Sequence, residues 1–261
     1  MKRIIILIAV LLMVIAGLVA SAQTEKPEIV TDRPDQTEAP VLVPKGGLQV
    51  ELGTSVENDK SNGVKYKNYT YGTALIKYGV NENFEFRLIS EYLGERIRSS
   101  ESQPTNFNGL SPLALGIKIK LADEKGFWPQ AALIGHINLK SGSSEFSPEY
   151  TAADFRFTFA HTLSDKFALS YNVGTEWNGQ TPDATFIYTV SLGYLITPKL
   201  GAFIESYGFL PEEENPDHRL DCGLTYKISP VVQFDVSGGI GITESAPDSF
   251  LSTGISFRMF K

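Results

Sequence analysis

The sequence has little of what many catalytic and nucleic-acid-binding proteins depend on. One cysteine, Cys222, excludes an internal disulfide and a cysteine-based structural zinc site. The three histidines, His136, His161 and His218, are too scattered for a metal motif recognised by spacing, and no Gly-rich phosphate loop is present. We therefore expect no metal and no cofactor. Lysine and arginine form no run, and 23 of them stand against 30 acidic residues, so we also expect no nucleic-acid partner.

Long apolar runs are also missing, with one exception at the start of the chain. Two basic residues precede an almost unbroken apolar run from Ile4 to Val19, and Ala20-Ser21-Ala22 has the small residues of a cleavage site. Residues 1–22 are therefore predicted to be a secretory signal peptide, removed before Gln23. The alternative is a retained membrane anchor, for which the run is slightly short.

From Leu48 onward, apolar residues occupy every second position, the period of a β-strand whose two faces meet different surroundings. Between Phe84 and Tyr92, for example, apolar side chains alternate with Glu85, Arg87 and Glu91. About twelve such segments of roughly 10 to 13 residues are long enough to cross a bilayer at a tilt. The alternating apolar positions by which these segments are recognised span residues 48–56, 69–80, 84–92, 113–119, 127–139, 154–159, 167–177, 186–196, 200–210, 219–227, 233–242 and 251–259.

The connections between these segments alternate between short and long. Residues 81–83 form a tight connection, for example, whereas 58–68 and 95–109 are long and polar. This order is typical of an outer-membrane barrel with tight periplasmic turns and longer outer loops. We therefore predict an all-β fold over residues 46–261: a transmembrane, up-and-down antiparallel β-barrel of about 12 strands in contact with lipid of the bacterial outer membrane. A soluble β-sandwich also has alternating strands, but strand length, loop order and aromatic residues at strand ends argue against it.

If the apolar face of each strand meets lipid, the opposite face lines the lumen. Nine acidic and seven basic residues lie on this face, a near balance that favours cross-strand ion pairs over a selectivity filter of one sign. Alternatively, these charges only neutralise one another inside a narrow, filled barrel. The candidate lumen and selectivity residues are Glu51, Glu85, Arg87, Glu91, Lys118, Lys120, Asp154, Arg156, Glu176, Arg219, Asp221, Lys227, Asp235 and Arg258, with Glu57 and Glu205 on the same face.

The segment before the first strand, residues 23–45, is called the leader here, and it is rich in proline and acidic residues. Its stretch TDRPDQTEAP, residues 31–40, followed by VPKG at 43–46, resembles the leader of an outer-membrane transporter family linked to the MetA pathway of phenol degradation. The resemblance extends to the final strand. It implies a channel-like protein for small solutes, in part of the family aromatic ones. Residues 252–259 are similar to the C-terminal signal that the barrel-assembly machinery recognises, with two further residues beyond it.

We expect the leader to fold back into the periplasmic mouth of the barrel as a plug. Its proline residues disfavour a regular helix and favour extended or turn geometry. Arg33 should then pair with a lumenal acid and Asp32 or Asp35 with a lumenal base, and Glu38 adds a further charge. A disordered tether before the barrel is the alternative.

The sequence leaves three functions open. The first is passive uptake of small solutes, including aromatic or hydrophobic compounds, through an outer-membrane channel. The second is a structural or surface-interaction barrel with a closed lumen. The third, a minor one, is an outer-membrane lipid hydrolase, and it is weak because Asn138 follows His136 and Leu163 follows His161 at the spacing where a serine would be needed. We therefore do not expect an enzyme.

Overall fold

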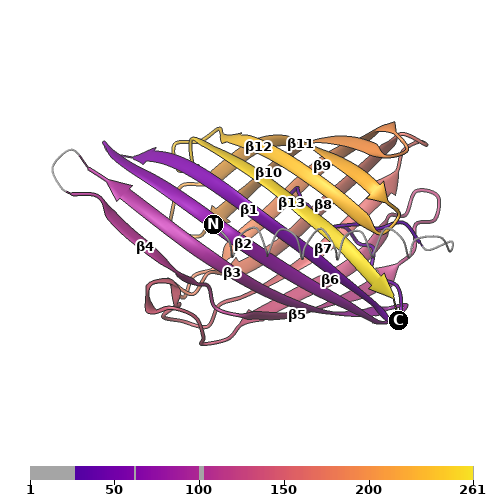
Figure 1. Ribbon diagram of the computed structural model, residues 1–261, viewed down its shortest axis with the longest axis horizontal. Coiled ribbons are helices and arrows are strands. Elements are labelled where there is room, and N and C mark those ends of the chain that lie inside the picture. The colour runs from indigo at the N-terminus through magenta and orange to yellow at the C-terminus, as the bar shows by residue number, and fades with distance from the viewer. Residues whose placement is uncertain (1–26, 62, 100–102, 261) are drawn as a thin grey trace, which may run out of the picture.

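The computed structural model describes residues 27–61, 63–99 and 103–260, so the predicted signal peptide lies outside the described residues. Thirteen strands form one antiparallel sheet, and the pairing of the first strand with the last, β1 with β13, closes it into a barrel (Figure 1). Within the described residues, no helix has the length and hydrophobicity needed to cross a membrane. The strands are β1 (Gly47–Ser61), β2 (Val64–Asn81), β3 (Phe84–Arg98), β4 (Thr105–Leu110), β5 (Ala114–Ala122), β6 (Gln130–Asn138), β7 (Ala153–Thr162), β8 (Phe167–Trp177), β9 (Thr185–Thr197), β10 (Leu200–Pro211), β11 (Asp217–Ser229), β12 (Val232–Gly241) and β13 (Ser249–Phe260).

The barrel has twelve strand positions, because β4 and β5 share one. Both pair with β3: β4 lies along residues 92–97 and β5 along residues 84–89. The break between them falls at Ser111-Pro112-Leu113, where proline has no N–H to donate to the ladder. The prediction of an up-and-down antiparallel barrel of about twelve strands is therefore confirmed.

Two predicted outer loops are largely strand, and there the prediction was wrong. The β1–β2 hairpin continues to the pair Ser61 and Val64, and β3 runs to Arg98. The reason is that alternation appears only where the two faces of a strand have different surroundings. Where both faces are polar, the sequence pattern disappears while the backbone ladder still satisfies its hydrogen bonds.

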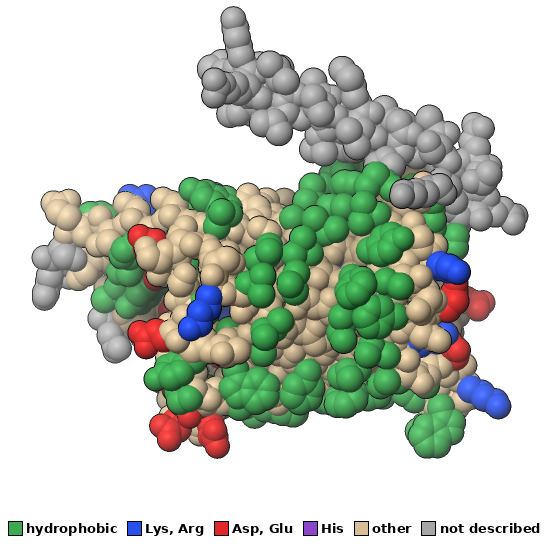
Figure 2. Space-filling view, turned by 90° about the horizontal axis from the view of Figure 1, so that it is seen from below, with side chains coloured by type: hydrophobic (Ala, Val, Ile, Leu, Met, Phe, Trp, Pro, Cys, Tyr) green, Lys and Arg blue, Asp and Glu red, His purple; other side chains and the backbone are tan. Residues whose placement is uncertain are grey.

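The barrel is apolar outside and polar inside. Outward side chains such as Phe86 and Ile204 are exposed, whereas inward ones such as Glu51 and Lys118 are fully buried. Figure 2 shows apolar side chains spread over the middle of one face, with charged ones toward the two ends. A small apolar cluster of Val231, Ile255 and neighbouring residues lies near the end that carries the short turns.

Candidate functional site

The described part of the leader, residues 27–45, lies inside the barrel, in the half nearest the short turns. No helix or strand forms between Pro27 and Lys45, so the backbone N–H groups of this stretch need partners elsewhere. Inward side chains of the barrel supply the acceptors. Glu51 accepts from Asp32 and Arg33, Glu205 from Gln36 and Thr37, Asn172 from Glu38, and Glu85 from Val43, at 2.7–3.1 Å.

Asp32 is the charged centre of the docked leader. Its buried carboxylate lies 2.7 Å from Nζ of Lys77, 2.9 Å from Nη1 of Arg87 and 3.0 Å from Nζ of Lys118. Burial alone would raise the pKa of Asp32, but the charges of Lys118, Lys77 and Arg87 outweigh it and hold that pKa well below its usual range. These cations come from β2, β3 and β5, so one leader residue forms ion pairs with three neighbouring strands.

Arg33 binds the leader to β12 and β13. These strands lie across the β1–β13 seam from the strands that supply the cations around Asp32. Nη2 of Arg33 lies 3.0 Å from the buried Asp235 carboxylate and 3.0 Å from Oγ of Ser252. The side chain passes over Gly53 and Gly254, and a Cβ at either position would lie within 2.4 Å of it. The missing side chains on these two inward positions therefore form the slot that Arg33 occupies.

The far end of the docked segment meets β9 and β10. Oγ1 of Thr37 lies 2.7 Å from Oγ1 of Thr189 and also donates to Glu205. Burial first, and then the charge of Glu205, raise the pKa of Asp35 well above its usual range. Asp221 faces Glu205 across the β10–β11 register, and both of its carboxylate oxygens are buried without a hydrogen-bond partner in the described part of the chain.

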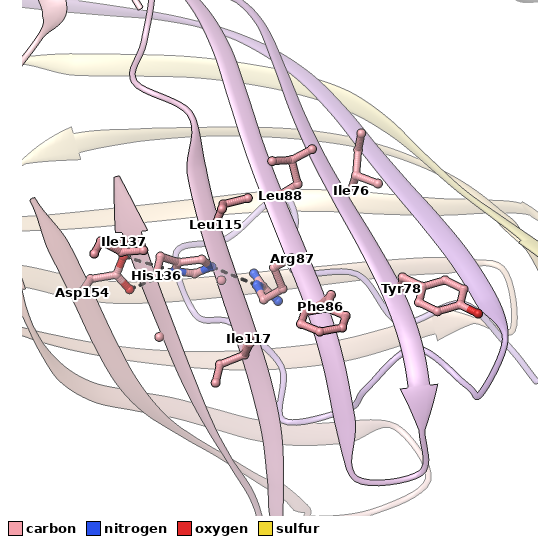
Figure 3. Close-up of a pocket in the computed structure, with 12 residues that line it drawn as sticks. Ile76, Tyr78, Phe86, Arg87, Leu88, Leu115, Ile117, His136, Ile137 and Asp154 are labelled. Carbon is pink, nitrogen blue, oxygen red and sulfur yellow. Dashed lines mark hydrogen bonds and ion pairs between the residues drawn. The ribbon is translucent and has the colours of Figure 1, made fainter. Parts of the chain in front are cut away.

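A chain of hydrogen bonds runs along the inner wall from Arg87 on β3 through His136 on β6 to Asp154 on β7 (Figure 3). Arg87 donates from Nη2 to Glu38 at 2.7 Å and from Nε to Nε2 of His136 at 3.0 Å. Nε2 of His136 is then an acceptor, so the ring carries its proton on Nδ1 and donates it to Asp154 at 3.0 Å. The ring fits beside Gly116, where a Cβ would lie 2.1 Å from Cδ2 of His136.

The other predicted lumen residues lie apart from this centre or at its edge. At the end with the long connections, Arg219 pairs with Glu57 at 2.8 Å and with Asp217, and Glu91 accepts from Thr73. At the end with the short turns, Lys120 pairs with Asp123 and Lys227 with Glu28 of the leader. Arg258 donates to Gln49 at 2.8 Å, Arg156 reaches the carbonyl of Gln36 at 3.4 Å, and Glu176 faces Asp154 across the β7–β8 register.

Sequence reasoning missed several residues that hold the leader. Lys77 was not selected because alternation in its segment is interrupted by bulges near Gly72 and Asn81. Asn172 and Thr189 hold the leader through neutral side chains, so a prediction based on charged residues does not select them. His136 lies on the weakly patterned segment 127–139, where its inward orientation was not predicted. Lys77 could have been found, because the tight connection at residues 81–83 sets the register of the hairpin, and this register places Lys77 opposite Arg87.

Two lumenal cavities lie on either side of the leader. One, of about 410 Å³, is bounded by residues 29–35 and by inner-face residues such as Ser191 and Phe203 near the short turns. The other, of about 280 Å³, lies under the long connections and is lined by Glu91, Asp154 and Phe146. A third hollow, of about 750 Å³, opens on the apolar outer surface over β3, β5 and β6 (Figure 3).

The histidines do not assemble a hydrolytic site among the described residues. His136 bonds to Arg87 and Asp154, His161 lies 3.3 Å from the Tyr171 hydroxyl, and His218 lies 2.8 Å from the Tyr188 hydroxyl. In the described part of the chain, none of these rings bonds to a serine, which a Ser-His-acid mechanism requires.

Comparison with known proteins gives a family and a fold. The family model described as "Putative MetA-pathway of phenol degradation" matches residues 31–259. An outer membrane channel from Pseudomonas putida F1 has a TM-score of 0.70 at 12% identity, over 88% of this chain and 100% of that chain. The translocator domain of the autotransporter NalP from Neisseria meningitidis has a TM-score of 0.54 at 10% identity, over 83% and 90%. The KdgM porin has a TM-score of 0.51 at 12% identity, over 82% and 99%. No curated protein matches the sequence significantly.

Proposed function

Because the chain belongs to the family described as "Putative MetA-pathway of phenol degradation", we propose that it is an outer-membrane channel for small solutes whose lumen is closed by its own leader. The mature protein would begin near Gln23, after removal of the signal peptide. Solutes would cross by diffusion, without covalent chemistry, once the leader leaves its docked position.

One observation carries the proposal: the buried charges of the lumen pair with the leader more than with each other. Asp235, Arg87 and Lys118 each form an ion pair with a charged side chain of the leader, at 3.0, 2.7 and 3.0 Å. A barrel with a purely structural role could neutralise its wall by cross-strand pairs alone. A wall whose charges are complementary to a separate, irregular segment is typical of a closed channel with a removable plug.

The inner face of β10 indicates which solutes pass. Phe203, Tyr207 and Phe209 point into the lumen, although apolar side chains in a barrel ordinarily face lipid. The Arg219 guanidinium lies 5.9 Å from the ring centre of Tyr207 and 5.7 Å from that of Phe209. This aromatic and cationic surface suits aromatic or hydrophobic compounds that carry a polar or anionic group. The family description supports the same class.

A reversible cross-link between leader and wall tests the proposal. Thr37 and Thr189, whose hydroxyl oxygens lie 2.7 Å apart, are replaced by cysteine in a Cys222→Ser background. Single-channel conductance in planar bilayers is recorded with the disulfide formed and after reduction. We expect the double-cysteine variant to conduct after reduction and to stop conducting after oxidation. The matched controls are the two single-cysteine variants, whose conductance should be the same in both redox states.

The form that starts at Gly46 separates this function from its alternative. If the leader is the plug, this form should conduct in larger and steadier steps than the protein with its leader. Absence of conductance from the folded, leader-free barrel would contradict the channel and favour a structural or surface-interaction barrel with a closed lumen.

A further inference from the structure

Five basic side chains meet on the part of the sheet that extends beyond the barrel at the end with the long connections. Lys60 is the register partner of Lys65, and Lys65 of Arg98. Lys67 is the partner of Arg96 on the next row. We call Lys60, Lys65, Lys67, Arg96 and Arg98 the basic cluster. The sequence has no run of basic residues that would indicate this cluster, because its members come together only through the register of three strands.

The basic cluster lies on the outer face of the sheet and not on the lumenal one. Glu57 pairs with the lumenal Arg219, so Asn58 and Lys60 point to the other side by alternation. Tyr69, two residues from Lys67 and on the same face, stacks on Tyr71 at 5.3 Å between ring centres. A solute passing through the lumen therefore does not meet the cluster.

The charges of the basic cluster are largely uncompensated. Lys60, Lys65 and Arg98 are exposed, and none of the five has an ion pair with another described residue. Lys67 lies over the ring of Tyr69 at 5.4 Å, and Nε of Arg96 is buried without a hydrogen-bond partner in the described part of the chain. The cluster borders a hollow of about 410 Å³ that also includes Asp59 and Asp248, so basic side chains outnumber acidic ones there.

The position of the basic cluster relative to the membrane points to its partner. Tyr69, Tyr71 and Tyr92 form an aromatic group directly below it, with Tyr71 and Tyr92 at 5.8 Å between ring centres. Aromatic residues of membrane barrels lie at the interface between hydrocarbon and headgroups. Lys67 lies two residues beyond Tyr69 on β2, and Lys65 four, so the basic cluster begins at the level of lipid phosphates, which attract basic side chains electrostatically.

We propose that the basic cluster binds the phosphate groups of a phosphorylated glycolipid, of the lipid A type, in the outer leaflet. The inference requires the outer-membrane location proposed above, but it does not require that the lumen conducts. Its failure and that of the channel are therefore distinguished by different measurements. A row of cations on the outer wall, above an aromatic belt and beside lipid, has the complementary charge and the right height for this headgroup.

Retention of lipid A by the full-length protein tests the proposal. The protein is purified in detergent, titrated with bisphosphorylated lipid A, and the bound lipid is measured by native mass spectrometry. Lys65→Gln/Arg96→Gln/Arg98→Gln should weaken retention roughly 100-fold, since each cation near an anionic lipid surface contributes substantially. The matched control, Lys125→Gln/Lys166→Gln/Lys199→Gln, loses the same charge in exposed turns at the opposite end and should retain the lipid as the unsubstituted protein does.

Two further measurements test whether the phosphate group of lipid A is what binds, and whether free phosphate binds in its place. Lipid A without phosphate should bind equally weakly to the unsubstituted protein and to the triple variant. Inorganic phosphate at the same concentration should not displace lipid A. The heat-dependent mobility of each variant in detergent gels establishes that its barrel is folded. Equal retention by the folded triple variant, equal loss in the control, or displacement by inorganic phosphate would overturn the proposal.

Discussion

Gly53 and Gly254 are register partners across the β1–β13 seam, and together they leave the space in which the Arg33 guanidinium lies. A Cβ on Gly53 would lie 2.2 Å from Nη1 of Arg33. The nearest atoms belong to the far end of a flexible side chain, so the guanidinium and not the barrel would have to move. Gly53 is therefore a position where the smallest possible substitution acts on the leader alone.

Gly53→Ala should release Arg33 from Asp235 and raise the open fraction of the channel. Asp235 is then left buried without its guanidinium partner; a fully broken buried pair costs about 3 to 5 kcal/mol, and a partly displaced one costs the docked leader less. Open fraction is measured from single-channel records at fixed voltage. Gly193→Ala is the control. Gly193 also faces the lumen, but a Cβ there would have its nearest neighbour, the carbonyl oxygen of Ala168, at 3.8 Å and would displace nothing. Equal effects of both substitutions would show that the slot does not position Arg33.

Asp32→Asn should undock the leader more strongly. The substitution keeps the shape of the side chain but removes the charge that Lys77, Arg87 and Lys118 share, leaving buried cations with fewer counter-charges. Loss of one partner from a buried pair typically costs about 3 to 5 kcal/mol. Hydrogen exchange of the leader amides, followed by mass spectrometry, should therefore be faster. Glu28→Gln, which removes an exposed pair with Lys227, should leave exchange in residues 32–43 unchanged.

Acidification should tighten the plug through Asp35. Burial and the charge of Glu205 raise the pKa of Asp35 in the docked leader, so the docked state binds a proton more readily than the released state. Asp35 therefore stabilises docking at low pH, and this contribution is lost as the pH rises through the raised pKa. The lowered pKa of Asp32 acts oppositely, but its contribution is lost only below the usual range for a carboxyl group.

The fraction of time that the channel is open is measured from single-channel records between about pH 5 and pH 8. This interval lies above the ordinary pKa range of an aspartate. The open fraction should rise with pH in the unsubstituted protein. Asp35→Asn, which cannot ionise, should hold the leader docked across the range and flatten the dependence. A slope that persists unchanged in Asp35→Asn would assign the titration to the neighbouring Glu205 and Asp221 instead.

Most of the barrel follows from local sequence, whereas most of the site does not. Alternation places Glu51, Lys118 and Asp235 on the inner face because the outer face of each strand is apolar and the inner face is polar. Which of them meet one another depends on the shear of the closed sheet and on bulges, such as the one near Gly72, that no local pattern specifies. The basic cluster was missed for the same reason, since its rows exist only once β1, β2 and β3 are in register.

The leader shows a second limit of sequence reasoning. Its charges predicted docking, and the structure places Arg33 against an acid and Asp32 against bases. The role of the wall carboxylates was not predicted, because Glu51 and Glu205 accept backbone N–H groups of the leader as well as charge. Every leader residue except proline has a backbone N–H, so the sequence of the leader does not indicate which of these groups a wall carboxylate accepts from.

His136 should contribute to stability through its two hydrogen bonds and not through its volume alone. The ring accepts from Arg87 at 3.0 Å and donates to Asp154 at 3.0 Å, and both partners are charged groups of the inner wall. His136→Ala leaves Nε of Arg87 and the Asp154 carboxylate without this partner, and it should lower the free energy of unfolding by about 1 to 3 kcal/mol. A glutamine amide has one acceptor and two donor hydrogens, so His136→Gln should recover part of the loss. Urea unfolding of the refolded barrel in lipid vesicles measures both variants. Equal losses would mean that packing beside Gly116, and not the hydrogen-bonded chain from Arg87 to Asp154, is what the imidazole supplies.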